Sequence, residues 1–287
     1  MAVSRRAASE GDTMRQPNWR AFAEGTAIPL AILIVWQIVC ALGLNDPLKL
    51  PSPFAVFIRF WRYVLPEQPL NPAAGFSLAW LFSGEFFRDA AGSLYRITIG
   101  FLVGAALAFP VGLAMGNSPL VYRMMNPLLQ VLRPIPPIAY IPLSMNWFGL
   151  GNPPAIFLIA LGAFFPILIN TIDGVRTVDS IYLRAARNLG ASQLTIFRRV
   201  ILPAAMPHIL SGVRVGIGTA FIVVIVAEMI AVNNGLGFRI LESREGFWTD
   251  KIIAGMFAIG LVGFAIDTVF DRLNRHLLRW HRGLENN

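Results

Sequence analysis

The chain has 287 residues, of which 55% are hydrophobic and 14% are charged, and its mean hydropathy is +0.60. Soluble domains average about 45–50% apolar and about 25% charged residues, so the composition excludes an ordinary soluble domain and predicts an integral membrane protein. The net charge of +8 does not indicate nucleic-acid binding, because the basic residues flank apolar stretches instead of lining one groove.

Runs of about 20 mostly apolar residues are long enough to cross a bilayer as helices. Six such runs occur, at roughly 26–44, 92–115, 124–148, 153–173, 207–231 and 252–271. They predict an all-α, polytopic helical bundle in a membrane. With the N-terminus inside, the inner segments carry about twice as many Lys and Arg residues as the outer ones, so both termini are expected in the cytoplasm.

The segment between the first two runs is long for a connection. Ser52-Pro53 begins a stretch in which Phe54, Phe57 and Trp61 recur beside basic residues, as in a helix that lies in the membrane surface. We therefore divide the chain into an N-terminal part with the first anchor and an outer interfacial segment, a core domain and a short cytoplasmic tail. Their limits are residues 1–89, 90–280 and 281–287.

Small residues recur at steps of four in the second run and again in the fifth. Such ridges allow another helix to approach closely along a crossing path. The positions are Gly100, Gly104, Ala108, Gly112 and Gly116, followed by Gly212 and Gly216.

Prolines interrupt the third run. Arg133-Pro134-Ile135-Pro136-Pro137 and then Pro142 remove backbone donors, which kinks or breaks a helix. Broken helices at membrane depth survive where protein or a watery cavity satisfies the freed carbonyls. The third run therefore favours a transport pathway.

Arg133 and Glu228 are ionisable groups near or within the runs, where such residues are costly and face a cavity or each other. Two interpretations stay open. Arg133 attracts or gates an anion that Glu228 positions, or the role is structural. In the structural interpretation the two form a salt bridge between the third and fifth runs, or Arg133 snorkels from the membrane interface. Pro136, Ser144 and Asn170 are further pathway candidates, although polar residues between helices more often join helices.

Residues 177–203, which we call the knob, form a polar interruption between the fourth and fifth runs. Tyr182, Ala185, Ala186 and Leu189 recur at i, i+3, i+4 and i+7, which predicts a short helix with one apolar stripe. Gly190 is expected to stop that helix because it adopts a left-handed conformation readily.

The second half of the knob predicts another helix. Ser192 is a suitable cap for it, and Leu202-Pro203 opens the next run. Its apolar and basic residues are Ile196, Phe197, Val200 and Ile201, with Arg198 and Arg199. A compact helix–Gly–helix unit that is part apolar and part basic is expected to contact a soluble partner.

No catalytic or metal-binding set is expected. His208, His276 and His281 are not spaced as helical metal ligands, and no Gly-x-Ser-x-Gly pattern occurs. The chain's two lysines, Lys49 and Lys251, are not preceded by glycine, so there is no phosphate-binding loop of the Gly-Lys-Ser/Thr type. An intramembrane enzyme is the weaker hypothesis.

The knob resembles the cytoplasmic coupling signature of permease subunits of bacterial ATP-binding-cassette importers. The matching residues are Ala185-Ala186, Gly190, Val200 and Leu202-Pro203 at the signature's spacing. Residues 132–142, 162–170 and 227–229 are similar to the branch that imports nitrate, aliphatic sulfonates, taurine and bicarbonate. The resemblance covers about residues 90–280. It departs at Arg184, where the signature has Glu, and at Val200, where it has Ile.

The resemblance implies a type I importer permease that works by alternating access as a homodimer in the bacterial inner membrane. It also implies two separate ATPase subunits, which bind ATP and Mg, and a periplasmic binding protein that docks on outer loops such as 233–251. This chain itself holds no cofactor. The coupling residues that it implies are Ala185, Ala186, Arg187, Gly190, Phe197, Arg198 and Pro203.

The solute stays open at this point. A small oxyanion suits an arginine in the pathway, whereas relatives of this type also carry bicarbonate or neutral heterocyclic compounds. An ion-coupled secondary transporter is the competing class, but such proteins usually show membrane-embedded carboxylates in paired halves. In this chain, Glu228 and Asp267 are the plausible membrane-embedded carboxylates.

Overall fold

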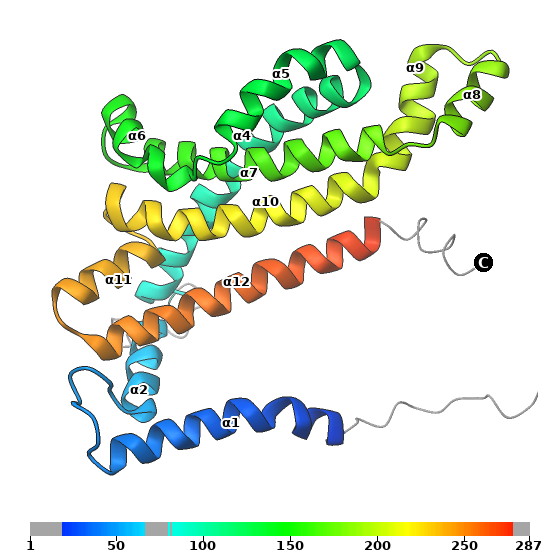
Figure 1. The fold of residues 1–287 in the computed structure, drawn as a ribbon. Helices are drawn as coiled ribbons and strands as arrows, with labels where there is room; N and C mark the ends of the chain where they lie inside the picture. Colours follow the sequence, from blue (N-terminus) through cyan, green and yellow to red (C-terminus); the bar gives the residue numbers. More distant parts are fainter. Residues whose placement is uncertain (1–18, 67–79, 81, 278–287) are drawn as a thin grey trace, which may run out of the picture.

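The computed structural model describes residues 19–66, 80 and 82–277, and within this part every regular element is helical (Figure 1). The all-α prediction is therefore confirmed. In chain order the elements are α1 (Trp19–Ala41), α2 (Pro53–Val64), α4 (Glu85–Asn117), α5 (Pro119–Leu132), the 3-10 helix η1 (Pro137–Tyr140), α6 (Ile141–Phe148), α7 (Asn152–Arg176), α8 (Ser180–Asn188), α9 (Gln193–Ile196), the π-helical turn η2 (Phe197–Ile201), α10 (Leu202–Ala231), α11 (Leu236–Glu245) and α12 (Thr249–Leu277).

Four helices of the described part are long and apolar enough to cross a membrane. They span Glu85–Asn117, Asn152–Arg176, Gln193–Ala231 and Thr249–Arg275, and a shorter apolar helix covers Gly25–Ala41. These helices coincide with the predicted first, second, fourth, fifth and sixth runs. The predicted boundary at residues 89–90 falls within α4, and the predicted tail, 281–287, lies outside the described residues.

The third run is not one helix. The chain leaves α5 after Leu132, forms the four-residue η1 and continues as the eight-residue α6. Pro134, Pro136 and Pro137 cause this because they have no N–H to continue the helical hydrogen bonds. The predicted break in the third run, residues 124–148, is confirmed.

α7 lies at the centre of the core, with α4 and α10 packed along it (Figure 1). The approach is so close that a Cβ atom on Gly104 would meet the backbone carbonyl of Ala160, and one on Gly116 would lie 2.6 Å from Val175. A Cβ atom on Gly212 of α10 would likewise lie 2.5 Å from the Asn170 side chain. The predicted small-residue ridges are thus confirmed as packing surfaces, and both face α7.

α2 has the predicted character of a surface helix. It begins at Pro53, and the Ser52 hydroxyl accepts a hydrogen bond from the Ala55 N–H at 3.2 Å, as an N-cap does. Val56 and Tyr63 are buried while Phe57 is exposed. Its buried face packs against α4 and α12.

The knob and α11 lie at opposite ends of the α4–α7–α10 core (Figure 1). We call these the knob end and the α11 end. A contiguous apolar core of buried side chains fills the space between them, formed mainly by α4, α7 and α10. A rigid body of this kind carries forces from one end to the other with little internal adjustment, because its interior is closely packed.

Candidate functional site

The first arm of the knob is the helix α8. The Asp179 carboxylate accepts a hydrogen bond from the Ile181 N–H at 2.8 Å and caps its start. At its end, Gly190 has a φ of +76°, and its N–H donates to the Arg187 carbonyl at 2.9 Å. The predicted stop at Gly190 is confirmed, since this left-handed conformation is unfavourable for residues with a Cβ atom.

The second arm begins at the predicted cap. The Ser192 hydroxyl accepts from the Thr195 N–H at 3.3 Å, and the helix then runs without interruption from Gln193 to Ala231. A π-helical turn, Phe197–Ile201, lies just before Pro203. Proline lacks the N–H that would continue the regular pattern, which accounts for an irregular turn here. The second arm is therefore a rigid extension of α10.

The two arms are held together by a small apolar cluster. Leu183 and Ala186 of α8 pack with Ile196 and Ile201 of the second arm and with Val175 at the end of α7. The knob is therefore fixed to both α7 and α10.

Three of the four residues of the predicted stripe on α8, Tyr182, Ala185 and Leu189, are exposed, whereas Ala186 packs into the cluster. Tyr182 is 64% exposed and Leu189 is 88% exposed, and Ile181 and Leu194 are also exposed. Arg184 and Arg187 of α8, and Arg198 and Arg199 of the second arm, are exposed as well. Of the predicted coupling residues, Ala185, Arg187, Gly190 and Arg198 are exposed, whereas Ala186, Phe197 and Pro203 are half-buried. An exposed apolar patch with a basic rim is typical of a protein-binding surface.

Glu228 of α10 is completely buried at the α11 end. Its Oε1 accepts a hydrogen bond from Arg96 Nη1 at 2.6 Å, and its Oε2 accepts from the Ser93 hydroxyl and the Gly237 N–H, both at 2.9 Å. The predicted salt bridge between Glu228 and Arg133 is therefore wrong. The partner of Glu228 is Arg96 on α4, which the sequence analysis did not name.

Arg96 joins three other parts of the chain to α4. Besides Glu228, its Nε donates to Asn152 Oδ1 at the start of α7 at 2.7 Å. It also donates to the Asn234 backbone carbonyl at 3.2 Å and to the Asn234 side-chain oxygen. The guanidinium is almost fully buried, so these contacts replace the water that it has lost.

Asp89 extends this network toward the surface. Its carboxylate accepts from the Tyr63 hydroxyl at 2.8 Å, from Arg239 Nε at 2.9 Å and from the Gly235 N–H at 3.3 Å. Burial, followed by the nearby Asp89 carboxylate, raises the pKa of Tyr63 above its usual range. Tyr63 therefore stays a neutral donor, and α2, α4 and α11 share one buried anchor.

A cavity of about 280 Å³ lies between α5 and α7. Arg133 lines it, and Asp173 is the carboxylate among the residues around it. The other predicted pathway residues do not gather at this cavity. Asn170 donates to the Pro166 carbonyl and Ser144 to the Ile141 carbonyl, each at 2.8 Å, and Pro136 is exposed just before η1.

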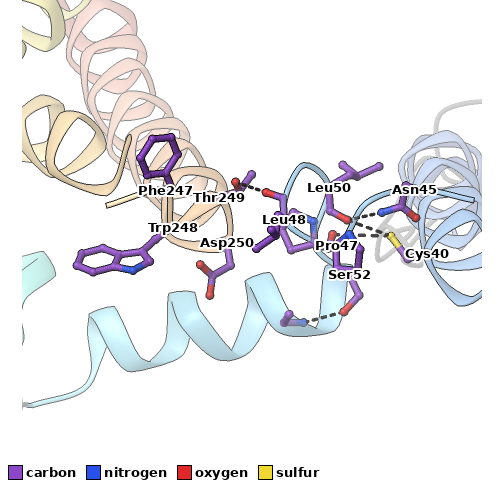
Figure 2. A pocket seen from close by; sticks show the side chains of 12 residues that line it. Cys40, Asn45, Pro47, Leu48, Leu50, Ser52, Phe247, Trp248, Thr249 and Asp250 are labelled. Carbon is purple, nitrogen blue, oxygen red and sulfur yellow. Dashed lines mark hydrogen bonds between the residues drawn. The ribbon is translucent and has the colours of Figure 1, made fainter. Parts of the chain in front are cut away.

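A second hollow, of about 460 Å³, lies near the α11 end between the α1–α2 connection and the turn before α12. Figure 2 shows the Thr249 hydroxyl donating to the Leu48 carbonyl, at 2.5 Å, and Asn45 donating to the Leu50 carbonyl, at 2.6 Å. Phe247, at a φ of +57°, is 86% exposed beside it. Phe247, Trp248, Thr249 and Asp250 belong to the predicted outer loop, 233–251, and the other lining residues belong to the segment 40–55.

Residues 100–283 match the family described as the binding-protein-dependent transport system inner membrane component. The chain belongs to this family of ATP-binding-cassette permeases. It is 36% identical over 262 residues to a putative aliphatic sulfonates transport permease of Bacillus subtilis (strain 168), which covers 91% of this chain and 89% of the relative. It is 37% identical over 253 residues to the taurine transport permease of Escherichia coli (strain K12), which covers 88% of each chain.

Two further comparisons agree with this assignment. The permease is 34% identical over 267 residues to a bicarbonate transport permease of Synechococcus elongatus, with 91% of this chain and 93% of the relative covered. A structure of the MetNI methionine ABC transporter in an inward-facing conformation matches with a TM-score of 0.60 at 19% identity, over 70% of this chain and 99% of that chain. The type I importer permease fold is therefore confirmed.

The buried network of the permease is the functional feature that sequence reasoning missed. Asp89, Ser93 and Arg96 stand at i, i+4 and i+7 on α4, which places them on one helical face. Polar residues with this spacing at the start of an apolar helix were the available signal. Within the described residues, no group of three or more His, Cys, Asp or Glu side chains is arranged to hold a metal ion.

Proposed function

We propose that this permease is the transmembrane subunit of an ATP-driven importer for a small anionic solute such as an aliphatic sulfonate, taurine or nitrate. The observation that carries the proposal is the rigid knob, whose apolar side chains are exposed although they lie outside the spans, in a chain that belongs to a binding-protein-dependent family. Identities of 36% and 37% to permeases named for sulfonates and taurine support the solute class. So does the arginine in the α5–α7 cavity.

In this proposal the knob receives mechanical work from a separate ATPase subunit, which binds ATP and Mg. The exposed patch of Tyr182, Leu189 and Leu194 enters a groove of that ATPase, and the surrounding arginines contact its rim. Because the knob continues directly into α10 and packs on α7, a displacement of the knob moves both helices. Ala185, Ala186, Gly190 and Pro203 supply the compact shape.

The full assembly contains two copies of this permease, two ATPase subunits and a periplasmic binding protein. The pair of permeases alternates between inward-open and outward-open states in the bacterial inner membrane. Both termini lie in the cytoplasm, on the same side as the knob. The binding protein docks at the opposite side, on the surface that includes 233–251 and the exposed Phe247.

Bicarbonate is the second candidate solute, because the similarity to a bicarbonate permease extends over 91% of this chain. Bicarbonate is also a small oxyanion, so the same arginine would suit it. An ion-coupled secondary transporter is less consistent with the chain, since Glu228 is fully paired with Arg96, Ser93 and Gly237 and has no free oxygen for a transported ion.

The coupling proposal is tested by a matched pair of glycine substitutions. Gly190 in the knob and Gly149 near the α11 end have φ values of +76° and +75°, and both have open space around the position of a Cβ atom. Gly190→Asp and Gly149→Asp therefore both place an Asp at a positive φ, at opposite ends, and Gly149 is a stringent control because its ψ of −157° belongs to a conformation almost confined to glycine. The measurement is the ATPase activity of the assembled transporter, with and without its binding protein and solute.

Gly190→Asp is expected to leave the permease in the membrane and to abolish transport-coupled ATP hydrolysis, because the side chain obstructs the knob surface. Gly149→Asp is expected to retain coupling. Normal coupling in Gly190→Asp, or transport by the purified permease without an ATPase, would contradict the proposed function.

A further inference from the structure

The cavity between α5 and α7 has one polar wall. Along α5, the residues Tyr122, Asn126, Gln130 and Arg133 follow one another at steps of four, four and three, and all of them line the cavity. This spacing places them in one row along a helix. The opposite wall is apolar over most of its length, because Phe165, Leu168, Ile169 and Ile172 of α7 form it.

The two ends of this row lie at different depths. Phe165 is the fourteenth of the 25 residues of α7, so the cavity reaches the middle of a membrane-spanning helix. The opposite end lies near the knob, where the Arg176 guanidinium stacks on the Tyr122 ring at 3.9 Å from its centre. α5 runs back from the knob end toward η1, so Arg133 occupies the deep end of the row and Tyr122 the end nearest the knob.

Arg133 has no ionic partner in the part of the chain that the structure describes, in which no carboxylate lies within 4.0 Å of its nitrogen atoms. The amides of Asn126 and Gln130 are also without hydrogen-bond partners among the described residues. This contrasts with Arg96, whose guanidinium is fully engaged. Arg133 and Gln130 are exposed, whereas Arg96 is buried. A cation at membrane depth is costly unless an anion or water accompanies it, so the deep end of the cavity is open to an anionic ligand.

We infer that this wall of α5 is the solute-binding surface of the permease, and that it selects small oxyanions. The inference rests on the proposed function and names the residues that bind the solute. Arg133 supplies two parallel N–H groups that match the oxygens of a sulfonate, nitrate or bicarbonate group. Asn126 and Gln130 donate further hydrogen bonds to the same ligand as it moves along the row.

Asp173 defines the end of this surface. It is the carboxylate that lines the cavity, and it belongs to the last turn of α7, near the knob. At this end the Asp173 carboxylate and the Arg176 guanidinium, which stacks on Tyr122, offset each other in charge, so the net positive charge along the cavity lies at the Arg133 end. A neutral solute would gain nothing from this charge pattern.

The test uses ethanesulfonate as the anionic probe and dimethyl sulfone as a neutral probe of similar size. Binding is measured by saturation-transfer NMR on the permease–ATPase assembly without the binding protein. Uptake of ethanesulfonate is measured in vesicles with the complete transporter. Arg133→Gln is the central variant and Arg133→Lys keeps its charge. Arg123→Gln is the control, because Arg123 is exposed on the same helix and does not line the cavity.

We expect the unaltered assembly to bind ethanesulfonate but not dimethyl sulfone. Arg133→Gln should lose this signal and lower the maximal uptake rate by about tenfold or more, as loss of a charge-assisted hydrogen bond implies. The half-saturating concentration should stay the same, because the separate binding protein sets it. Arg133→Lys should retain at least about a third of the uptake, and Asn126→Ala should lower it severalfold.

The inference would be overturned if the unaltered assembly bound no ethanesulfonate, or if Arg133→Gln bound and transported it normally. It would also be overturned if Arg133→Gln and Arg133→Lys both failed to assemble with the ATPase, since that would indicate a structural role. If Arg133→Gln leaves uptake unchanged, the assignment of the solute-binding site to α5 is rejected, but the proposed function is not. The paired glycine substitutions test the proposed function separately.

Discussion

The α11 end and the knob end of the permease are built from opposite chemistry. At the α11 end, Asp89, Arg96 and Glu228 are buried and joined by hydrogen bonds of 2.6–3.3 Å to α2, α7 and α11. At the knob end, apolar side chains such as Leu189 are exposed on the surface. The knob arginines lie more than 4.0 Å from every described carboxylate.

The difference indicates which end has its polar and apolar groups satisfied within one chain. Polar groups in a buried network are satisfied only when every member is present, so the α11 end behaves as a single rigid anchor. The knob leaves apolar area in contact with solvent, which a separate chain can cover. Substitutions at the α11 end should therefore change stability, and those on the knob surface should change assembly and coupling.

The largest effect on stability is expected from Arg96→Ala. It leaves the completely buried Glu228 carboxylate without its cation, and breaking a buried pair by removing one partner costs about 3–5 kcal/mol. The measurement is thermal unfolding of the purified permease in detergent.

The control is Arg275→Ala, which removes an exposed pair with Asp271 near the end of α12. Exposed pairs contribute about 0–1 kcal/mol, so this variant should unfold close to the unaltered protein. Equal losses of unfolding free energy in the two variants would contradict the view that burial makes the Arg96–Glu228 pair at the α11 end important for stability.

The sequence predicted the knob more fully than the network, for a physical reason. The signals in the knob are local, since helix periodicity, Gly190 and the Ser192 cap act within a few residues. In contrast, Arg96 and Glu228 are 132 residues apart, and Asp89 and Arg239 are 150 residues apart. No local pattern pairs such residues, which explains the wrong pairing of Glu228 with Arg133.

The third run shows an intermediate case. Its prolines predicted a break, because a missing N–H acts locally. The lengths of the pieces depend on how α5 packs against α4 and how η1 and α6 pack against α7, and the sequence does not specify that packing directly. The glycines predicted that α4 and α10 each approach another helix closely, but they did not predict that both approach α7.

The second largest effect is expected from Gly104→Ala. Its Cβ atom would overlap the Ala160 carbonyl of α7, and overpacking of this kind costs about 1–3 kcal/mol. Gly218→Ala is the matched control, because a Cβ atom there meets nothing within 4 Å. In a helix interior, alanine is favoured over glycine by about 1 kcal/mol, so Gly218→Ala should raise the unfolding temperature while Gly104→Ala lowers it.

A smaller effect is expected from Asp179→Ala in the knob. It removes the hydrogen bond that the carboxylate accepts from the Ile181 N–H, and the loss of an N-cap costs about 1 kcal/mol. Hydrogen exchange of the α8 amides measures this local opening. Asp179→Asn keeps a capping oxygen and should exchange nearly as slowly as the unaltered permease. Equally fast exchange in both variants would rule out the cap as the cause.

The smallest effect on stability is expected from Leu189→Ser. The side chain is 88% exposed, so unfolding should change by no more than about 0.5 kcal/mol. Coupled ATPase activity should nevertheless fall, because the variant lacks the apolar side chain that we propose to contact the ATPase. A retained activity would remove Leu189 from the proposed contact surface.

Photo-crosslinking tests the central claim most directly. With Cys40 changed to Ser, Leu189→Cys carries a thiol-attached benzophenone on the knob, and Phe247→Cys carries it at the α11 end. Our account predicts that the ATPase subunit is crosslinked from position 189 and not from position 247. A crosslink to the ATPase from position 247, with none from position 189, would contradict it.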